Sequence, residues 1–330
     1  MEILNIYFYA TLVLINLITL KLISFLSKKY NFYDLPNERK LHSQPTSYFG
    51  GILFFLSNFF YILYFKTLVF ESHFIIYNLS HIFSLIFISS FIFLVGLIDD
   101  KVDLSPLKKT IFLIILISSS VMIDGDLLIS KLNLELIDKE LQLKNFAFFF
   151  TILCIYIFIN ASNMFDGADL QLGLYFFVII IYLYFKSDFL NIFAPLIISL
   201  TIFLFANFKK ICFMGNNGSH FLSYVLSIFI IKFYNMGILN TVEEVVIVML
   251  IPGLDLIRLF IKRVLNNKKF FESDLDHVHH IIARSKSKYL VQIIVLIFNI
   301  SPIIVAEIVG SYFIGIIFGV ISYFFLIRKA

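Results

Sequence analysis

The chain has 330 residues, of which 60% are hydrophobic and only 15% are charged. This composition excludes an ordinary soluble domain, which needs more polar surface to cover its core. Apolar stretches long enough to cross hydrocarbon as helices recur along nearly the whole length. We therefore expect an all-α polytopic membrane protein. The formal net charge of +4 is mild, and no nucleic-acid partner is expected.

Eleven apolar stretches are predicted to form transmembrane helices. The N-terminus is expected outside and the C-terminus in the cytoplasm, because this orientation leaves only six of the 26 Lys and Arg residues on the outer side. The outer loop at 124–145 alternates apolar and charged residues, which predicts a small hairpin. The predicted spans are roughly 3–26, 50–70, 79–98, 110–123, 146–160, 170–185, 190–206, 219–235, 242–262, 289–309 and 311–327.

The chain is predicted to be one membrane domain whose chemistry lies in its cytoplasmic loops. Asp, Asn, His, Gly and Pro concentrate in these loops, whereas the span interiors are mostly Ile, Leu and Phe. The first loop runs from Asp34 through Lys40 to Gly50-Gly51, and its composition alone fits a positive-inside anchor. The five loops are 27–49, 99–109, 160–170, 207–219 and 263–288.

The second loop opens with Asp99-Asp100 at the inner end of a span and continues to Lys108-Lys109. Neighbouring carboxylates on a helix point about 100° apart, so one can bind a cation while the other faces a substrate. The pattern is typical of a Mg²⁺ and phosphate site. A solvated helix end is the alternative interpretation.

The third and fourth loops are rich in amides and glycines. The third runs from Asn160 to Asp169 and supplies donors and acceptors suited to a sugar, a base edge or a metal. Such groups are costly near hydrocarbon, which argues against a plain turn. The fourth runs from Phe213 to Ser219, where glycines and a helix start can receive an anion. Taken alone, the pattern of the fourth loop is also compatible with a simple turn.

The fifth loop carries Asp274 and the segment His277-Val278-His279-His280. Zinc is one interpretation of this cluster, but no cysteine is close and Lys and Arg surround it. Contact with phosphate is therefore favoured over zinc and over a solvated surface. Just before this loop, Asp255 and Arg258 stand at i,i+3 and are expected to pair.

Taken in order, these loops resemble those of the polyprenyl-phosphate N-acetylhexosamine-1-phosphate transferases of glycosyltransferase family 4. These enzymes move a sugar-1-phosphate from a UDP-sugar onto a membrane polyprenyl phosphate. The resemblance covers about residues 34 to 280, and all its motifs fall on the predicted cytoplasmic side. The motifs are Asp-x-Pro-x-x-Arg-Lys-x-His followed by Gly-Gly, the Asp-Asp pair, Asn-Ala-x-Asn-x-x-Asp-Gly-x-Asp, Phe-x-Gly-x-x-Gly-Ser and Asp-x-x-His-x-His-His.

The resemblance implies that a polyprenyl phosphate oxygen attacks the β-phosphorus of UDP-HexNAc, with GlcNAc or a related 2-acetamido sugar, and releases UMP. Mg²⁺ or Mn²⁺ is the implied cofactor. The implied partners are UDP-HexNAc, undecaprenyl phosphate and membrane lipid, and a homodimer is left open. The implied location is the bacterial inner membrane, with the site facing the cytoplasm. Eleven spans and the interrupted histidine motif favour the undecaprenyl-phosphate GlcNAc-1-phosphate transferase-like branch, which initiates surface glycans.

Roles for individual residues also follow from the resemblance. They are catalytic roles for Asp99, Asp100, Asp166 and His279; nucleotide contacts for Asn163, Asp166, Asp169 and Phe213; phosphate contacts for Lys40, Lys109, His277, His279 and His280; and metal contacts for Asp99, Asp100 and Asn216.

Three positions depart from the family pattern. Asn216 stands where the family has a metal-binding aspartate, Leu170 replaces a glycine, and Leu275 replaces a basic residue. An amide lacks the charge that a hard cation prefers, so an impaired family member is one alternative. A phospho-N-acetylmuramoyl-pentapeptide transferase is another. A secondary transporter is less favoured, because the span midplanes carry few charges.

Overall fold

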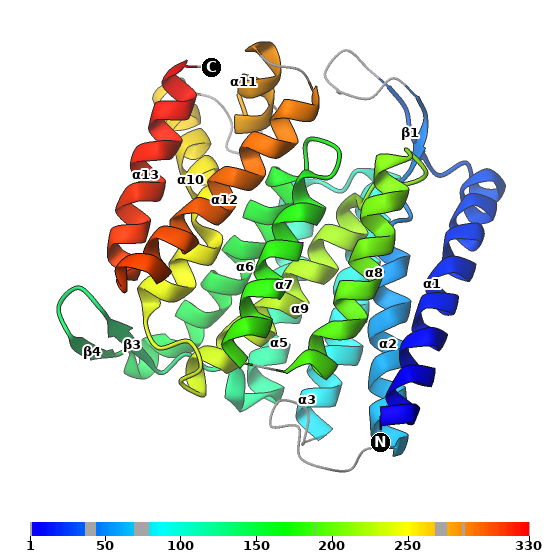
Figure 1. The fold of residues 1–330 in the computed structure, drawn as a ribbon, viewed down its shortest axis with the longest axis horizontal. Coiled ribbons are helices and arrows are strands. Elements are labelled where there is room, and N and C mark those ends of the chain that lie inside the picture. The colour runs from blue at the N-terminus through cyan, green and yellow to red at the C-terminus, as the bar shows by residue number, and fades with distance from the viewer. Residues whose placement is uncertain are drawn as a thin grey trace.

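The computed structural model describes residues 2–36, 44–68, 79–187, 189–267, 276–285 and 288–329. In this part of the chain, long helices run side by side in a bundle (Figure 1). The expected helical membrane protein is confirmed at this level. Its strands form two small antiparallel pairs, β1 with β2 and β3 with β4.

Over the described residues, each apolar stretch predicted from the sequence coincides with helix to within one residue at its ends. The helices are α1 (Glu2–Tyr30), α2 (Gly51–Leu68), α3 (Leu79–Phe83), the π-helical η1 (Ser84–Ile88), α4 (Ser89–Val102), α5 (Pro106–Ile123), the short η2 (Gly125–Leu127) and η3 (Lys144–Phe146), α6 (Ala147–Phe165), α7 (Gln171–Ser187), α8 (Leu190–Phe208), α9 (Gly215–Asn235), α10 (Val242–Leu265), α11 (Val278–Ser285), α12 (Lys288–Val309) and α13 (Tyr312–Lys329). The strands are β1 (Tyr33–Asp34), β2 (Thr46–Ser47), β3 (Lys131–Leu134) and β4 (Lys139–Gln142).

Five segments among the described residues are long and apolar enough to cross a membrane. They are Ile6–Tyr30, Ser80–Val102, Pro106–Ile123, Lys144–Phe165 and Leu290–Val309. Shorter apolar helices occupy Gly51–Leu63, Gln171–Ser187, Ile192–Phe208 and Tyr312–Arg328. The predicted helix positions are thus confirmed, while eleven crossings and their orientation stay a prediction.

The two ends of the bundle differ. Strands β3 and β4 pair as an antiparallel hairpin, as expected for loop 124–145. The N-terminus lies at the same end of the bundle as this hairpin (Figure 1). The C-terminus, α11 and the β1–β2 pair lie at the opposite end. Termini at opposite ends are what an odd number of crossings produces.

Helix α9 forms the centre of the bundle. Gly215 and every residue from Asn217 to Tyr234 are buried, so the helix has no solvent- or lipid-facing side over that length. Helices α4, α6 and α2 pack on it. Because α9 is enclosed on all sides, its first turn is held firmly against the ends of its neighbours, and the polar loops gather there.

Candidate active site

Asp99 and Asp100 lie in the last turn of α4 and face the first turn of α9. Helix α4 ends at Asp103, whose left-handed backbone (φ 54°) turns the chain away. After that turn, the backbone N–H of Leu104 donates to Asp99 Oδ1 at 3.0 Å. The buried Asp99 and its neighbour are therefore fixed by the way α4 terminates.

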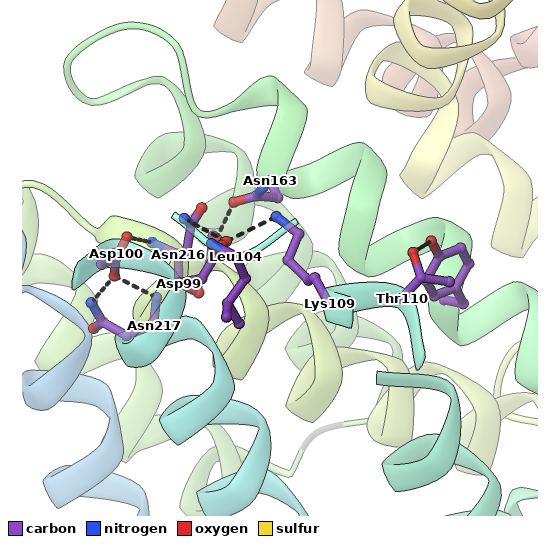
Figure 2. A network of polar contacts seen from close by, with 10 residues as sticks. Asp99, Asp100, Leu104, Lys109, Thr110, Asn163, Asn216 and Asn217 are labelled. Atoms are coloured by element: carbon purple, nitrogen blue, oxygen red, sulfur yellow. Dashed lines mark hydrogen bonds and ion pairs between the residues drawn. The ribbon is translucent and has the colours of Figure 1, made fainter. Parts of the chain in front are cut away.

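Every carboxylate oxygen of this pair accepts from nitrogen donors. Asp99 Oδ2 accepts from Lys109 Nζ at 3.0 Å and from Asn216 Nδ2 at 2.9 Å (Figure 2). Asp100 Oδ1 accepts from the Asn216 backbone N–H at 2.8 Å. Asp100 Oδ2 accepts from Asn217 Nδ2 at 2.6 Å and from its backbone N–H at 3.1 Å. The start of α9 thus supplies hydrogen bonds to both acids, and Lys109 offsets the charge of Asp99.

Glycines allow this close approach of helices. A Cβ built on Gly96 of α4 would lie 2.5 Å from the backbone oxygen of Asn216. A Cβ on Gly51, at the start of α2, would lie 2.0 Å from Asn217 Oδ1. Both distances are far below van der Waals contact. Glycine at these positions brings α2, α4 and the start of α9 together, with Gly215 (φ 70°) making the turn into α9.

The third loop lies beside this pair. Asn163 Oδ1 accepts from Ser219 Oγ of α9 at 2.8 Å. Asp166 caps the C-terminal end of α6 and lines a cavity. Protein atoms surround its carboxyl group and remove much of its hydration. That desolvation, with the charge of Asp100 as the second cause, raises the pKa of Asp166 to about 7. Asp169 pairs with Lys210, so this predicted nucleotide contact already has a basic partner.

The first and fourth loops are tied together through their backbones. The N–H of Phe213 donates to the Ser47 oxygen at 2.7 Å, and the N–H of Gly50 donates to the Phe213 oxygen at 3.0 Å. Tyr48 donates its hydroxyl to Asp34 Oδ1 at 2.7 Å. This strand-like pairing places Phe213 at the edge of the same site.

These loops enclose a cavity of about 580 Å³, within the range of small-molecule sites. It brings together most of the residues singled out in the sequence. The predicted site residues that line it are Asp99, Asp100, Asn163, Asp166, Asp169, Phe213, Asn216 and His280. Lys109 reaches the site through Asp99. Lys40 lies outside the described residues.

The structure gives the three histidines different surroundings. His280 lines the cavity. His279 is 1% exposed and packs against Gly167, where a built Cβ would lie only 1.8 Å from its Nε2 atom. Burial, followed by the charges of His280 and His277, holds the pKa of His279 well below its ordinary value. His277 contacts Asp255 of α10. Phosphate contact by all three stays a prediction, and His280 has the direct access that it requires.

Sequence reasoning missed several residues of the site. Tyr48 accepts from Asn217 Nδ2 through its backbone oxygen at 2.8 Å. Asn207 joins two loops, because its Oδ1 accepts from the Leu170 N–H at 2.6 Å and its Nδ2 donates to the Cys212 oxygen at 2.9 Å. A polar Asn at the end of an apolar stretch was the available signal for Asn207. A backbone contact such as that of Tyr48 leaves no signal in the sequence.

The residues present can fit a hard divalent cation. Two carboxylates and an amide carbonyl are oxygen ligands of the kind that Mg²⁺ prefers. Asn216 directs its NH₂ group at Asp99, so its amide would have to turn over to offer its oxygen. Asp99, Asp100 and Asn216 are therefore compatible with the predicted metal site, with one negative charge fewer than three carboxylates would provide.

A second group of metal-ligand types lies elsewhere. Among the described residues, His81, Asp124 and Asp126 place ligand atoms within 4.8 Å of one another. Asp124 is also paired with Lys232 Nζ at 2.9 Å, near the far end of α9. Lys232 is 16 residues after Asn216, which is about 24 Å along a helix. This cluster is therefore separate from the Asp99 and Asp100 pair, and Lys232 already supplies a cation to it.

Comparisons with known proteins agree with the resemblance seen in the motifs. The family model "Glycosyl transferase family 4" matches residues 82–234. A "Probable undecaprenyl-phosphate N-acetylglucosaminyl 1-phosphate transferase" of Bacillus subtilis is 27% identical, covering 88% of this chain and 83% of the relative. An "Undecaprenyl-phosphate alpha-N-acetylglucosaminyl 1-phosphate transferase" of Escherichia coli K12 is 27% identical over 78% of this chain and 71% of its own length. A Thermotoga maritima protein of the same name is 25% identical, with 87% and 85% covered.

Proposed function

Because this chain belongs to glycosyl transferase family 4, we propose that it transfers a HexNAc-1-phosphate from a UDP-sugar to undecaprenyl phosphate and releases UMP. GlcNAc or a related 2-acetamido sugar is the expected HexNAc, and the product would begin a lipid-linked surface glycan. The observation that carries the proposal is the single cavity lined by residues of all five polar loops, with Lys109 beside it.

The chemistry proposed for this cavity is phosphoryl transfer by positioning. The lipid phosphate has a second pKa near about 6, so at neutral pH it is a ready anionic nucleophile. Its oxygen would form a bond to the β-phosphorus of the donor while the bond from that phosphorus to the UMP oxygen breaks. Such transfers depend mainly on alignment and on neutralising charge.

Each part of the site has a role in this proposal. Lys109 and His280 would contact phosphate oxygens, and Phe213 would stack on the uracil ring. Asn163 and Asp166 would bind the nucleoside. Asp99, Asp100 and Asn216 would hold Mg²⁺ or Mn²⁺, which neutralises diphosphate charge when bound. We further propose eleven crossings, with this cavity on the cytoplasmic side of a bacterial inner membrane.

The test is UMP release by purified, detergent-solubilised protein with undecaprenyl phosphate, Mg²⁺ or Mn²⁺, and UDP-GlcNAc. UDP-MurNAc-pentapeptide and deoxy-HexNAc nucleotides are assayed in parallel. Asp99→Asn and Asp100→Asn should each abolish turnover. Glu140→Gln is the matched carboxylate-to-amide control, because Glu140 lies exposed on β4 and pairs with Lys131.

The outcomes are distinct. UMP that depends on both lipid and metal, with UDP-GlcNAc as donor, supports the proposal. UMP from UDP-MurNAc-pentapeptide alone identifies the alternative substrate. No UMP from any donor, with Asn216→Asp restoring it, identifies an impaired family member. No UMP from either protein overturns the proposed reaction.

A further inference from the structure

The three imidazole rings of the fifth loop form a row that ends at the cavity. The centroids of the His277 and His279 rings are 5.4 Å apart, and the rings are nearly parallel at 10°. The His279 and His280 centroids are 4.4 Å apart. His280 lines the cavity at one end of this histidine row, and His277 stands at the other. A shift of the first ring is therefore transmitted to the last by direct contact.

The first ring is held by a buried carboxylate on α10. Asp255 is 3% exposed. Its Oδ2 lies 3.1 Å from His277 Nδ1, and its Oδ1 accepts from the backbone N–H of Val278 at 3.2 Å. One side chain thus fixes both the imidazole of His277 and the peptide that begins α11.

Asp255 is itself held from two helices. Its Oδ1 accepts from Arg258 at 2.7 Å, which confirms the i,i+3 pair expected from the sequence. The same oxygen accepts from the hydroxyl of Tyr323 on α13 at 2.8 Å. Arg258 also donates to the Tyr323 hydroxyl at 3.0 Å and to the Asp276 backbone oxygen. With Arg258, Tyr323 and Val278 all on Oδ1, the carboxylate has one orientation, and Oδ2 faces His277.

We propose that Asp255 is a positioning residue for the transfer reaction. Its carboxylate keeps the His277 proton on Nδ1 and fixes the first ring, and the histidine row carries this placement to His280 at the cavity. A carboxylate that selects the tautomer and orientation of a histidine is a recurring device in enzymes. The rate predicted below rests on the proposed function, whereas the tautomer does not.

The kinetic test compares Asp255→Asn with Tyr323→Phe. The control removes one hydrogen bond to Oδ1 and leaves the carboxylate and its contact with His277. We expect Asp255→Asn to lower kcat about tenfold to a hundredfold with KM for the UDP-sugar within about twofold, since alignment rather than binding is lost. Tyr323→Phe should stay within about threefold of wild type. In a His277→Gln background, Asp255→Asn should have little further effect.

A spectroscopic test reads the tautomer directly. In Asp255→Asn, the three donors would keep the amide oxygen at the Oδ1 position, so the NH₂ group would face His277 and force its proton onto Nε2. Nitrogen-15 spectra of histidine-labelled protein, assigned with His277→Gln, should show an Nδ1–H tautomer in wild type and an Nε2–H tautomer in the variant. Asp255→Glu keeps the charge and should keep the wild-type tautomer.

Three results would overturn the proposal. One is an Nε2–H tautomer for His277 in the wild-type protein, a reading that needs no Asp255 variant and no transferase activity. Another is kcat within twofold of wild type in a folded Asp255→Asn protein. The last is an equal loss from Asp255→Asn with and without His277, which would assign Asp255 a purely structural role.

Discussion

Replacing Gly96 by Ala tests whether the contact between α4 and α9 sets the site. The added Cβ would lie 2.5 Å from the Asn216 backbone oxygen, so the start of α9 would have to move by about 0.9 Å to reach ordinary contact. The bonds from Asn216 to Asp99 and Asp100, now 2.9 and 2.8 Å, would then exceed the usual limit of about 3.2 Å. Overpacking of this kind costs about 1–3 kcal/mol.

The expected result is a fall in kcat of about a hundredfold, because a misplacement near 1 Å in a site has that effect. UMP release and thermal unfolding in detergent would measure both consequences. Gly253→Ala is the matched control, since a Cβ there meets nothing within 4 Å in helix α10. It should keep full activity and gain up to about 1 kcal/mol of stability. Wild-type kcat and unfolding temperature in Gly96→Ala would refute the reasoning.

Three further predictions follow from the charges. Asn216→Asp should lower the half-saturating Mn²⁺ concentration, measured by electron paramagnetic resonance, about tenfold; an unchanged affinity would contradict the metal assignment. Desolvation raises the pKa of both Asp166 and Asp100 to about 7, so kcat/KM should fall as the pH drops through 7. Asp166→Asn should make this fall less steep; a pH profile with the wild-type slope would argue against titration of Asp166. Lys232→Met should lower the free energy of unfolding by roughly 3–5 kcal/mol, because it leaves Asp124 buried without its lysine. Adding Asp124→Asn should recover much of this loss. Equal unfolding midpoints for wild type and Lys232→Met would count against this prediction.

Local patterns in the sequence predicted more than long-range ones. The Asp255 and Arg258 pair was readable because i,i+3 neighbours meet on any helix. The hairpin at 124–145 was readable from alternation over a few residues. The apolar stretches located the helices for the same reason, since periodicity and length act within one element.

Contacts between distant elements were not readable in this way. The motifs suggested that the loops act together, but they did not show that Asn217 caps Asp100 or that His277 reaches Asp255. Gly167 is explained only by the ring of His279 that packs on it. Which side chain meets which depends on how whole helices pack, and one sequence does not encode that in any local spacing.

The burial of α9 has a consequence for how the protein is made. Ser219, Ser223, Ser227 and Lys232 are buried in it, and α9 is not among the described helices whose length and apolarity suit them to a lipid environment. Such a helix is poorly soluble in hydrocarbon by itself. The helices that pack on it, α2, α4 and α6, all precede it in the chain. They can therefore be in the bilayer before α9 is synthesised, so that α9 enters a protein-lined space and the order of the chain becomes an order of assembly.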